Sequence, residues 1–196
     1  MPLPSNEPPL ELWLLQSLPK GDRWSWLLAK GTELGVTRFL PLRSERTVAG
    51  GEREADTGKA SRWASIAAAA AKQCERGTLP EVLPLATLGD CLRALGQPAP
   101  GELRLCLTER QPGAALPRGC TPSRVILAVG PEGGWSPRDR APFRDAGFRE
   151  TGLGPRILRA ETAALASLTL AQSLWGDLVA PQDPELALRS TQGGGT

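Results

Sequence analysis

Short apolar segments of strand length alternate with longer helix-like segments along most of this chain, and this alternation constrains the fold more than any other feature. The strand-like segments are residues 10–15, 36–42, 103–107, 124–129 and 148–153. The helix-like segments are residues 23–34, 56–75, 87–95, 137–146 and 160–178. Strands that alternate with helices favour an α/β layer fold, because each helix returns the chain so that the next strand lies parallel to an earlier one. We predict a largely parallel sheet flanked by helices.

The length of the chain fits one compact domain. Its 196 residues, of which 40% are hydrophobic, are enough to build a core. We expect residues 1–9, rich in proline, to be a disordered lead-in or linker remnant, residues 10–180 to form the domain, and the glycine-rich residues 181–196 to be a disordered tail. Without a long apolar run or a signal peptide, we expect a cytoplasmic protein that does not enter a membrane.

The inventory of reactive side chains excludes several kinds of chemistry. There is no histidine, and the four cysteines (74, 91, 106 and 120) are widely spaced without a CxxC pair. We therefore predict no metal site and interpret the cysteines as reduced, structural thiols. The missing histidine also removes the usual general base near neutral pH, so proton transfer must use a carboxylate, lysine, cysteine or solvent.

Positive charge is concentrated in one stretch. The formal net charge is only +2, but residues 138–159 contain six arginines against three acids, a local net charge of +3. Such a stretch fits contact with phosphates, and it equally fits a solvated helix face.

Two segments join the end of a predicted strand to a glycine turn and then to a helix. The first is VGPEGGWSP, residues 129–137, in which Ser136 and Pro137 form a helix cap and first position. The second is LGPRILRAETA, residues 153–163. Glycine allows the main chain to approach a ligand, and loops at the carboxyl ends of parallel strands are where α/β sheets bind ligands. Taken alone, each segment also fits a plain turn.

The second segment carries the charged side chains of interest. Arg156 and Arg159 flank an apolar pair, and both have the reach to stabilise an anion. Glu161 falls in the first turn of the following helix, where a carboxylate stabilises the positive helix end. It is also a candidate for accepting a proton, and both roles stay open.

The two segments together resemble, nearly residue for residue, the paired cofactor loops of the uridine-N3 methyltransferases in the SPOUT superfamily. Further matches in the same order are PKGDR (19–23), KGTELGV (30–36), SER (44–46) and QCER (73–76), so that the resemblance spans roughly residues 10–178. It implies a SPOUT fold with a C-terminal trefoil knot, S-adenosyl-L-methionine as cofactor, and N3 of a uridine in small-subunit (16S) ribosomal RNA as the methylated atom. It also implies a homodimer with the active site near its interface.

The resemblance also assigns roles to residues. Arg156, Arg159 and Glu161 would be catalytic. The cofactor would be held by Gly130, Pro131, Glu132, Gly133, Gly134, Leu153, Gly154, Ile157, Leu158, Thr162 and Ala163. RNA would be bound by Lys20, Arg46, Gln73, Arg76 and Arg138.

Three departures from the family pattern bear on this interpretation. Relatives carry an N-terminal β-barrel RNA-binding domain ahead of the matched residues, and this chain begins at or just after the place where it would end. Lys72 and Asp139 both stand where relatives have glutamate. Two alternatives therefore stay open, a non-catalytic RNA- or adenosylmethionine-binding module and a SPOUT methyltransferase that acts on another RNA.

Overall fold

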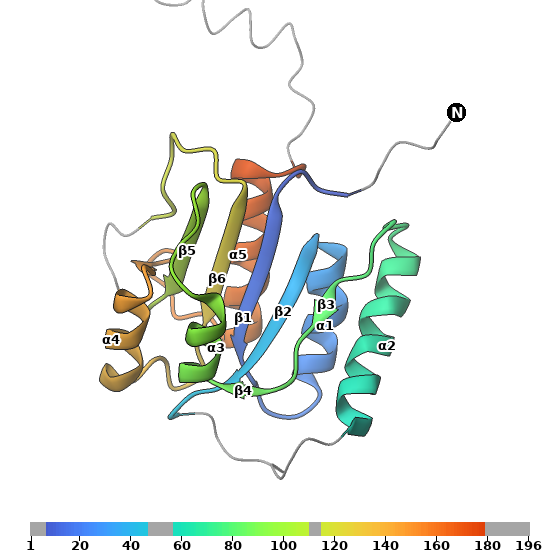
Figure 1. Ribbon diagram of the computed structural model, residues 1–196, viewed down its shortest axis with the longest axis horizontal. Coiled ribbons are helices and arrows are strands. Elements are labelled where there is room, and N and C mark those ends of the chain that lie inside the picture. Colours follow the sequence, from blue (N-terminus) through green and yellow to red (C-terminus); the bar gives the residue numbers. More distant parts are fainter. Residues whose placement is uncertain (1–6, 47–56, 110–114, 179–196) are drawn as a thin grey trace, which may run out of the picture.

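A parallel sheet forms the centre of the molecule (Figure 1). The computed structural model describes residues 7–46, 57–109 and 115–178. Its seven strands have the order β3-β2-β1-β6-β5-β7, with β4 also paired to β2, and every pairing is parallel. The strands are β1 (Glu11–Ser17), β2 (Val36–Arg43), β3 (Glu81–Val82), β4 (Ala86–Thr87), β5 (Glu102–Leu107), β6 (Arg124–Val129) and β7 (Arg149–Thr151). The α/β class predicted from the alternation is confirmed.

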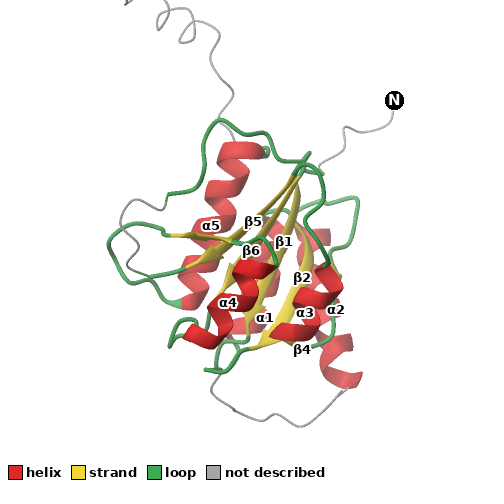
Figure 2. Cartoon of the chain, turned by 60° about the vertical axis from the view of Figure 1, so that its left-hand side comes forward, coloured by secondary structure: helices red, strands yellow, loops and turns green. Residues whose placement is uncertain are grey.

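Helices cover both faces of the sheet (Figures 1 and 2). On one face lie α1 (Arg23–Glu33), α2 (Thr57–Gln73) and α5 (Ala160–Trp175). On the other lie α3 (Leu88–Leu95) and α4 (Pro137–Asp145).

The central strand β1 shows how the sequence divides between the two faces. Leu12 and Leu14 pack in the core beneath α1 and α5. Trp13 and Leu15 point the other way, into the core beneath α3 and α4. Because neighbouring side chains of a strand alternate between faces, a strand buried on both sides is apolar over most of its length. Burial of each such leucine contributes roughly 1.5–3 kcal/mol.

The starts of two helices illustrate where local sequence decides structure. Ser136 caps α4 as predicted: its side chain accepts a hydrogen bond from the backbone N–H of Asp139, whose carboxylate accepts one from the N–H of Ser136. Pro137 occupies the first helical turn. The start of α1 is different, because Asp22 at its N-cap makes no side-chain cap hydrogen bond and its carboxylate lies 3.8 Å from Arg62 of α2.

Most expected elements agree with the observed ones, with three differences. The two-residue strands β3 and β4 were not predicted, since two residues carry no readable periodicity. The strand expected over residues 148–153 is limited to Arg149–Thr151. The last helix ends at Trp175, where Gly176 forms the C-cap, rather than at residue 178.

The expected lead-in and tail lie largely outside the described residues. Residue 7 belongs to the fold, however. The carboxylate of Glu7 accepts hydrogen bonds from Arg76 and from the backbone N–H of Thr78. Glu7 thus contacts the domain, which was expected to begin at residue 10. Across the described part of the chain, no helix has the length and apolar character needed to cross a membrane.

Candidate functional site

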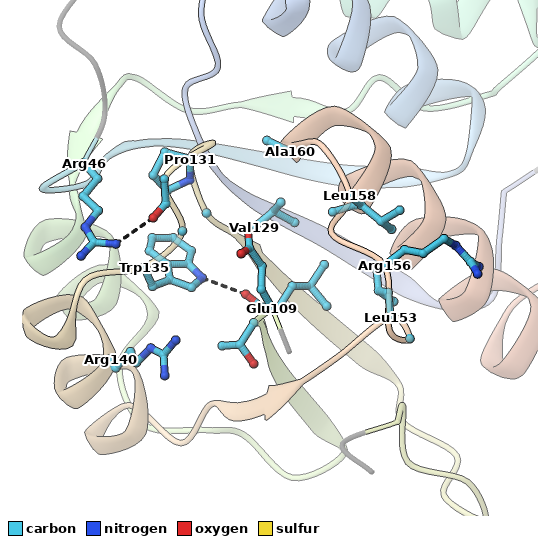
Figure 3. Close-up of a pocket in the computed structure, with 17 residues that line it drawn as sticks. Arg46, Glu109, Val129, Pro131, Trp135, Arg140, Leu153, Arg156, Leu158 and Ala160 are labelled. Carbon is cyan, nitrogen blue, oxygen red and sulfur yellow. Dashed lines mark hydrogen bonds between the residues drawn. The ribbon is translucent and has the colours of Figure 1, made fainter. Parts of the chain in front are cut away.

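A pocket of about 370 Å³ opens where three parallel strands end (Figure 3). The end of β5, the glycine-rich turn after β6 and the segment between β7 and α5 supply most of its wall, and two arginines from other segments complete it. The lining residues are Arg46, Leu107, Thr108, Glu109, Val129, Gly130, Pro131, Gly133, Gly134, Trp135, Arg140, Leu153, Gly154, Arg156, Leu158, Ala160 and Ala163. The two segments singled out in the sequence are thus brought together on one cavity at the carboxyl edge of the sheet, where α/β proteins bind ligands.

Trp135 shapes the first wall of the pocket. Its indole N–H donates to the carbonyl of Leu107 over 3.1 Å, and its ring packs edge-on against Phe143 at 4.7 Å between centroids. A Cβ atom at Gly130 would lie 3.2 Å from the same ring, so glycine at this position allows the ring to pack directly against the turn. Gly134 has a φ of +66°, which only glycine adopts readily. The turn is therefore fixed by packing, and Trp135 is a lining residue that the sequence analysis missed.

Charged side chains tie this turn to the rest of the carboxyl edge. Arg46 lines the pocket and donates to the carbonyl of Gly133 over 2.8 Å. Glu132, expected to bind cofactor, instead lies outside the lining and forms an ion pair with Arg23 at 3.1 Å. Arg23 is the first residue of α1 and was not singled out in the sequence.

Some residues of the second segment line the pocket, and others are exposed to solvent. Leu153, Gly154, Leu158 and Ala163 line the pocket, and so does Arg156. Gly154 has a φ of +101° and turns the chain after β7. The remaining predicted residues do not line it: Ile157 is 55% exposed, and Arg159 and Thr162 are also exposed.

Glu161 lies beside the pocket rather than in it. One of its carboxylate oxygens is 3.8 Å from the Arg23 guanidinium, and the other is buried without a hydrogen-bond partner among the described residues. Arg23 thus stands between Glu132 of the first segment and Glu161 of the second. Within the described residues, the only carboxylate that lines the pocket is that of Glu109.

The residues predicted to bind RNA fall at opposite edges of the sheet. Arg46, Lys20 and Arg138 lie at the carboxyl edge, where Lys20 is exposed and Arg138 lies 3.4 Å from Glu45. Gln73 is the last residue of α2, and Arg76 just after it reaches the amino edge of the sheet, where it bonds the carbonyl of Val36 at the start of β2.

The side chain of Arg76, which was predicted to bind RNA, is enclosed by the protein. Its side chain is only 4% exposed, and it donates to the carbonyls of Thr32 and Val36 and to the carboxylate of Glu7. A guanidinium so enclosed holds α1, β2 and the N-terminal segment together and is not open to a phosphate.

The cysteines show no sign of an activated thiol. All four are free, and Cys91 and Cys106 are buried. Burial raises the pKa of the Cys91 thiol to about 11 and raises that of Cys106 further. Across the described residues, no three cysteine or acidic side chains are grouped so as to hold a metal ion.

The fold and the pocket define the class. The RNA methyltransferase domain family matches residues 6–172, and the chain belongs to this family. Among curated proteins, it is 37% identical over 172 residues to the ribosomal RNA small subunit methyltransferase E of Synechocystis, a match that covers 86% of this chain and 55% of the relative. The Bacillus subtilis protein of the same name is 30% identical over 178 residues, covering 84% of this chain and 66% of the relative. The chain thus spans roughly half to two thirds of the length of these relatives.

Two solved structures of methyltransferases are similar to this chain. The ribosomal RNA small subunit methyltransferase E of Neisseria gonorrhoeae, bound to S-adenosylmethionine, is similar with a TM-score of 0.78 and 37% identity, over 88% of this chain and 70% of that one. A methyltransferase from Legionella pneumophila in complex with S-adenosylmethionine has a TM-score of 0.77 and 34% identity, over 89% of this chain and 70% of that one.

Proposed function

We propose that this chain transfers a methyl group from S-adenosylmethionine to N3 of a uridine in small-subunit ribosomal RNA. The observation that carries the proposal is the single pocket built from both glycine-bearing segments at the carboxyl edge of the sheet. Relatives that match most of this chain are named as small-subunit ribosomal RNA methyltransferases, and two similar structures hold S-adenosylmethionine. The expected trefoil knot and the uridine target are part of the proposal.

The pocket residues fit a nucleoside cofactor. A volume of about 370 Å³ lies within the range of small-molecule sites, roughly 300–1,000 Å³. Leu107, Leu153 and Leu158 offer apolar walls to a purine, and the closely packed turn at Gly130 leaves main-chain groups near the cavity. When bound, the cofactor supplies the electrophilic methyl group.

In this reaction the protein would orient the uracil ring and stabilise the negative charge that develops on it. A uracil N3–H is a weakly acidic imide, so the nitrogen must lose its proton before it can accept a methyl group. Arg156 lines the pocket and is exposed, which lets its guanidinium stabilise the negative charge that develops on the ring or hold a neighbouring phosphate. Because the chain has no histidine, a carboxylate is the preferred proton acceptor.

The position of Glu161 affects that assignment. Glu161 is held beside Arg23, and it would have to reach the ring from outside the pocket lining. Its candidacy depends on an RNA that approaches from the α1 side of the pocket. Glu161→Gln tests this, because a base role predicts loss of transfer with retained cofactor binding.

We also propose that the chain is a homodimer. Leu170 and Leu174 of α5 are 42% and 37% exposed, and Leu178 just beyond the helix is 47% exposed. Apolar side chains that line up on one exposed helix face mark an association surface. Trp175 packs against the core on the other side of the helix.

The test is direct. The chain is incubated with radiolabelled S-adenosylmethionine and small ribosomal subunits that lack the modification, and any modified base is mapped; Arg156→Ala serves as the inactive control. Label at N3 of a single uridine supports the proposal. Cofactor binding without transfer indicates a non-catalytic module, and label at another atom or in another RNA overturns the assigned target.

A further inference from the structure

Among the residues that the structure describes, Glu109 is the single acidic side chain on a pocket whose other charged side chains are arginines. Within the described residues, the charged lining side chains are Glu109, Arg46, Arg140 and Arg156. Figure 3 places Glu109 among the lining side chains between Trp135 and Leu153. No ion pair joins Glu109 to another described residue, whereas Arg46 already bonds the Gly133 carbonyl and Arg140 lies 3.9 Å from Glu150.

The backbone that presents Glu109 is held on both sides. The carbonyl of Leu107 accepts the indole N–H of Trp135 over 3.1 Å. The N–H of Thr108 donates to the carbonyl of Thr151 over 2.9 Å. The end of β5 that leads to Glu109 is therefore held in place, and the exposed Glu109 side chain follows it at the edge of the pocket. A held backbone lowers the entropic cost of binding.

The register places Glu109 one strand away from the glycine turn. In the parallel pairing of β5 with β6, Cys106 is opposite Ala128. Three residues further on, Glu109 comes alongside the turn that begins at Gly130. In dinucleotide-binding α/β sheets, an acidic residue about 20 residues after the glycine turn accepts a hydrogen bond from the ribose. Glu109 precedes the glycine turn in the chain, but it follows the neighbouring strand and lines the same pocket as the turn. Resting on the proposed function, we propose that Glu109 binds the ribose diol of the S-adenosylmethionine nucleoside.

Hydrogen-bond chemistry supports this choice. A vicinal diol presents two O–H donors, and a carboxylate can accept both. The three arginines can only donate, and the Leu107 carbonyl is already engaged by Trp135. Glu109 is therefore the charged acceptor that the pocket offers to such a group.

Three ligands and one substitution test whether Glu109 contacts the diol or another group of the cofactor. Calorimetry compares S-adenosylmethionine, S-adenosylhomocysteine and 5′-methylthioadenosine on the native chain and on Glu109→Gln. All three ligands carry the ribose, the first two carry the ammonium group, and only the first carries the sulfonium. We expect affinity to fall about tenfold for all three, the effect of losing one charge-assisted acceptor. Glu33→Gln, an equal change of charge on an exposed residue of α1, should change none of them.

A deoxyribose analogue gives the second measurement. The native chain should bind 2′,3′-dideoxy-S-adenosylhomocysteine about tenfold more weakly than the parent compound, while Glu109→Gln should bind the two alike. A loss confined to the ligands with an ammonium group, or to the sulfonium ligand, overturns the ribose assignment. Unchanged affinity for every ligand in Glu109→Gln overturns the role of Glu109. If the native chain binds none of the ligands, it is the proposed function that fails.

Discussion

Replacing Glu7 with glutamine should lower the free energy of unfolding in a pH-dependent way and leave RNA binding unchanged. Burial raises the pKa of the Glu7 carboxyl, but hydrogen bonds from Arg76 and Thr78 outweigh it and hold the pKa at about 2, against an ordinary value of 4.5. A shift of this size corresponds to at most about 3 kcal/mol of stability. Since the Glu7 side chain is 21% exposed, solvent screening reduces the expected loss to about 2 kcal/mol.

The sign of the pH dependence follows from the lowered pKa. A carboxyl that titrates lower in the folded chain stabilises it above the unfolded pKa, and this stabilisation is lost as the pH falls toward 2. Urea unfolding followed by tryptophan fluorescence should show the full difference between native and Glu7→Gln chains at pH 7. By about pH 3 the difference should shrink by about half.

Controls distinguish a structural Arg76 from an RNA-binding one. Glu33→Gln removes an exposed carboxylate paired with Lys30 and should cost less than about 0.5 kcal/mol. Arg76→Ala should destabilise at least as much as Glu7→Gln, because it also removes the donors to two buried carbonyls. An unaltered stability in Arg76→Ala together with weaker RNA binding would refute the reasoning and restore the RNA contact.

Three further predictions concern the site and its assembly. Arg156→Ala should keep cofactor affinity within a few-fold yet lower methyl transfer at least about a hundredfold; rescue by excess RNA or low salt would assign Arg156 to a phosphate, and unchanged turnover would remove it from the catalytic residues. Gly133→Trp should abolish cofactor binding in calorimetry, because position 133 lines the pocket beside Arg46; retained affinity would place the ligand elsewhere. Light scattering should give a dimer mass for the native chain and a monomer mass for Leu174→Glu, and a monomeric native chain at micromolar concentration would contradict the association surface.

The sequence predicted what local chemistry decides and missed what tertiary packing decides. Ser136 and Pro137 start α4 as expected, since a cap depends on residues within one turn. Trp135 and Glu109 enter the pocket only because β5 lies beside β6, a pairing that no local pattern encodes. Arg76 was named from its motif, but the sequence does not show whether an arginine side chain is solvated or enclosed by carbonyls.

The pairing of β1 with β6 has a consequence for synthesis on the ribosome. Glu11 of β1 and Arg124 of β6 are neighbours in the sheet but 113 residues apart in the chain. At about 5–20 residues per second, one edge of β1 stays unpaired for roughly 6–23 s after that strand has been made. An unpaired, apolar strand edge is a template for association with other chains. The nascent protein is therefore exposed to aggregation while its central strand lacks this partner, and the synthesis of β6 sets the earliest moment at which β1 can be paired on both edges.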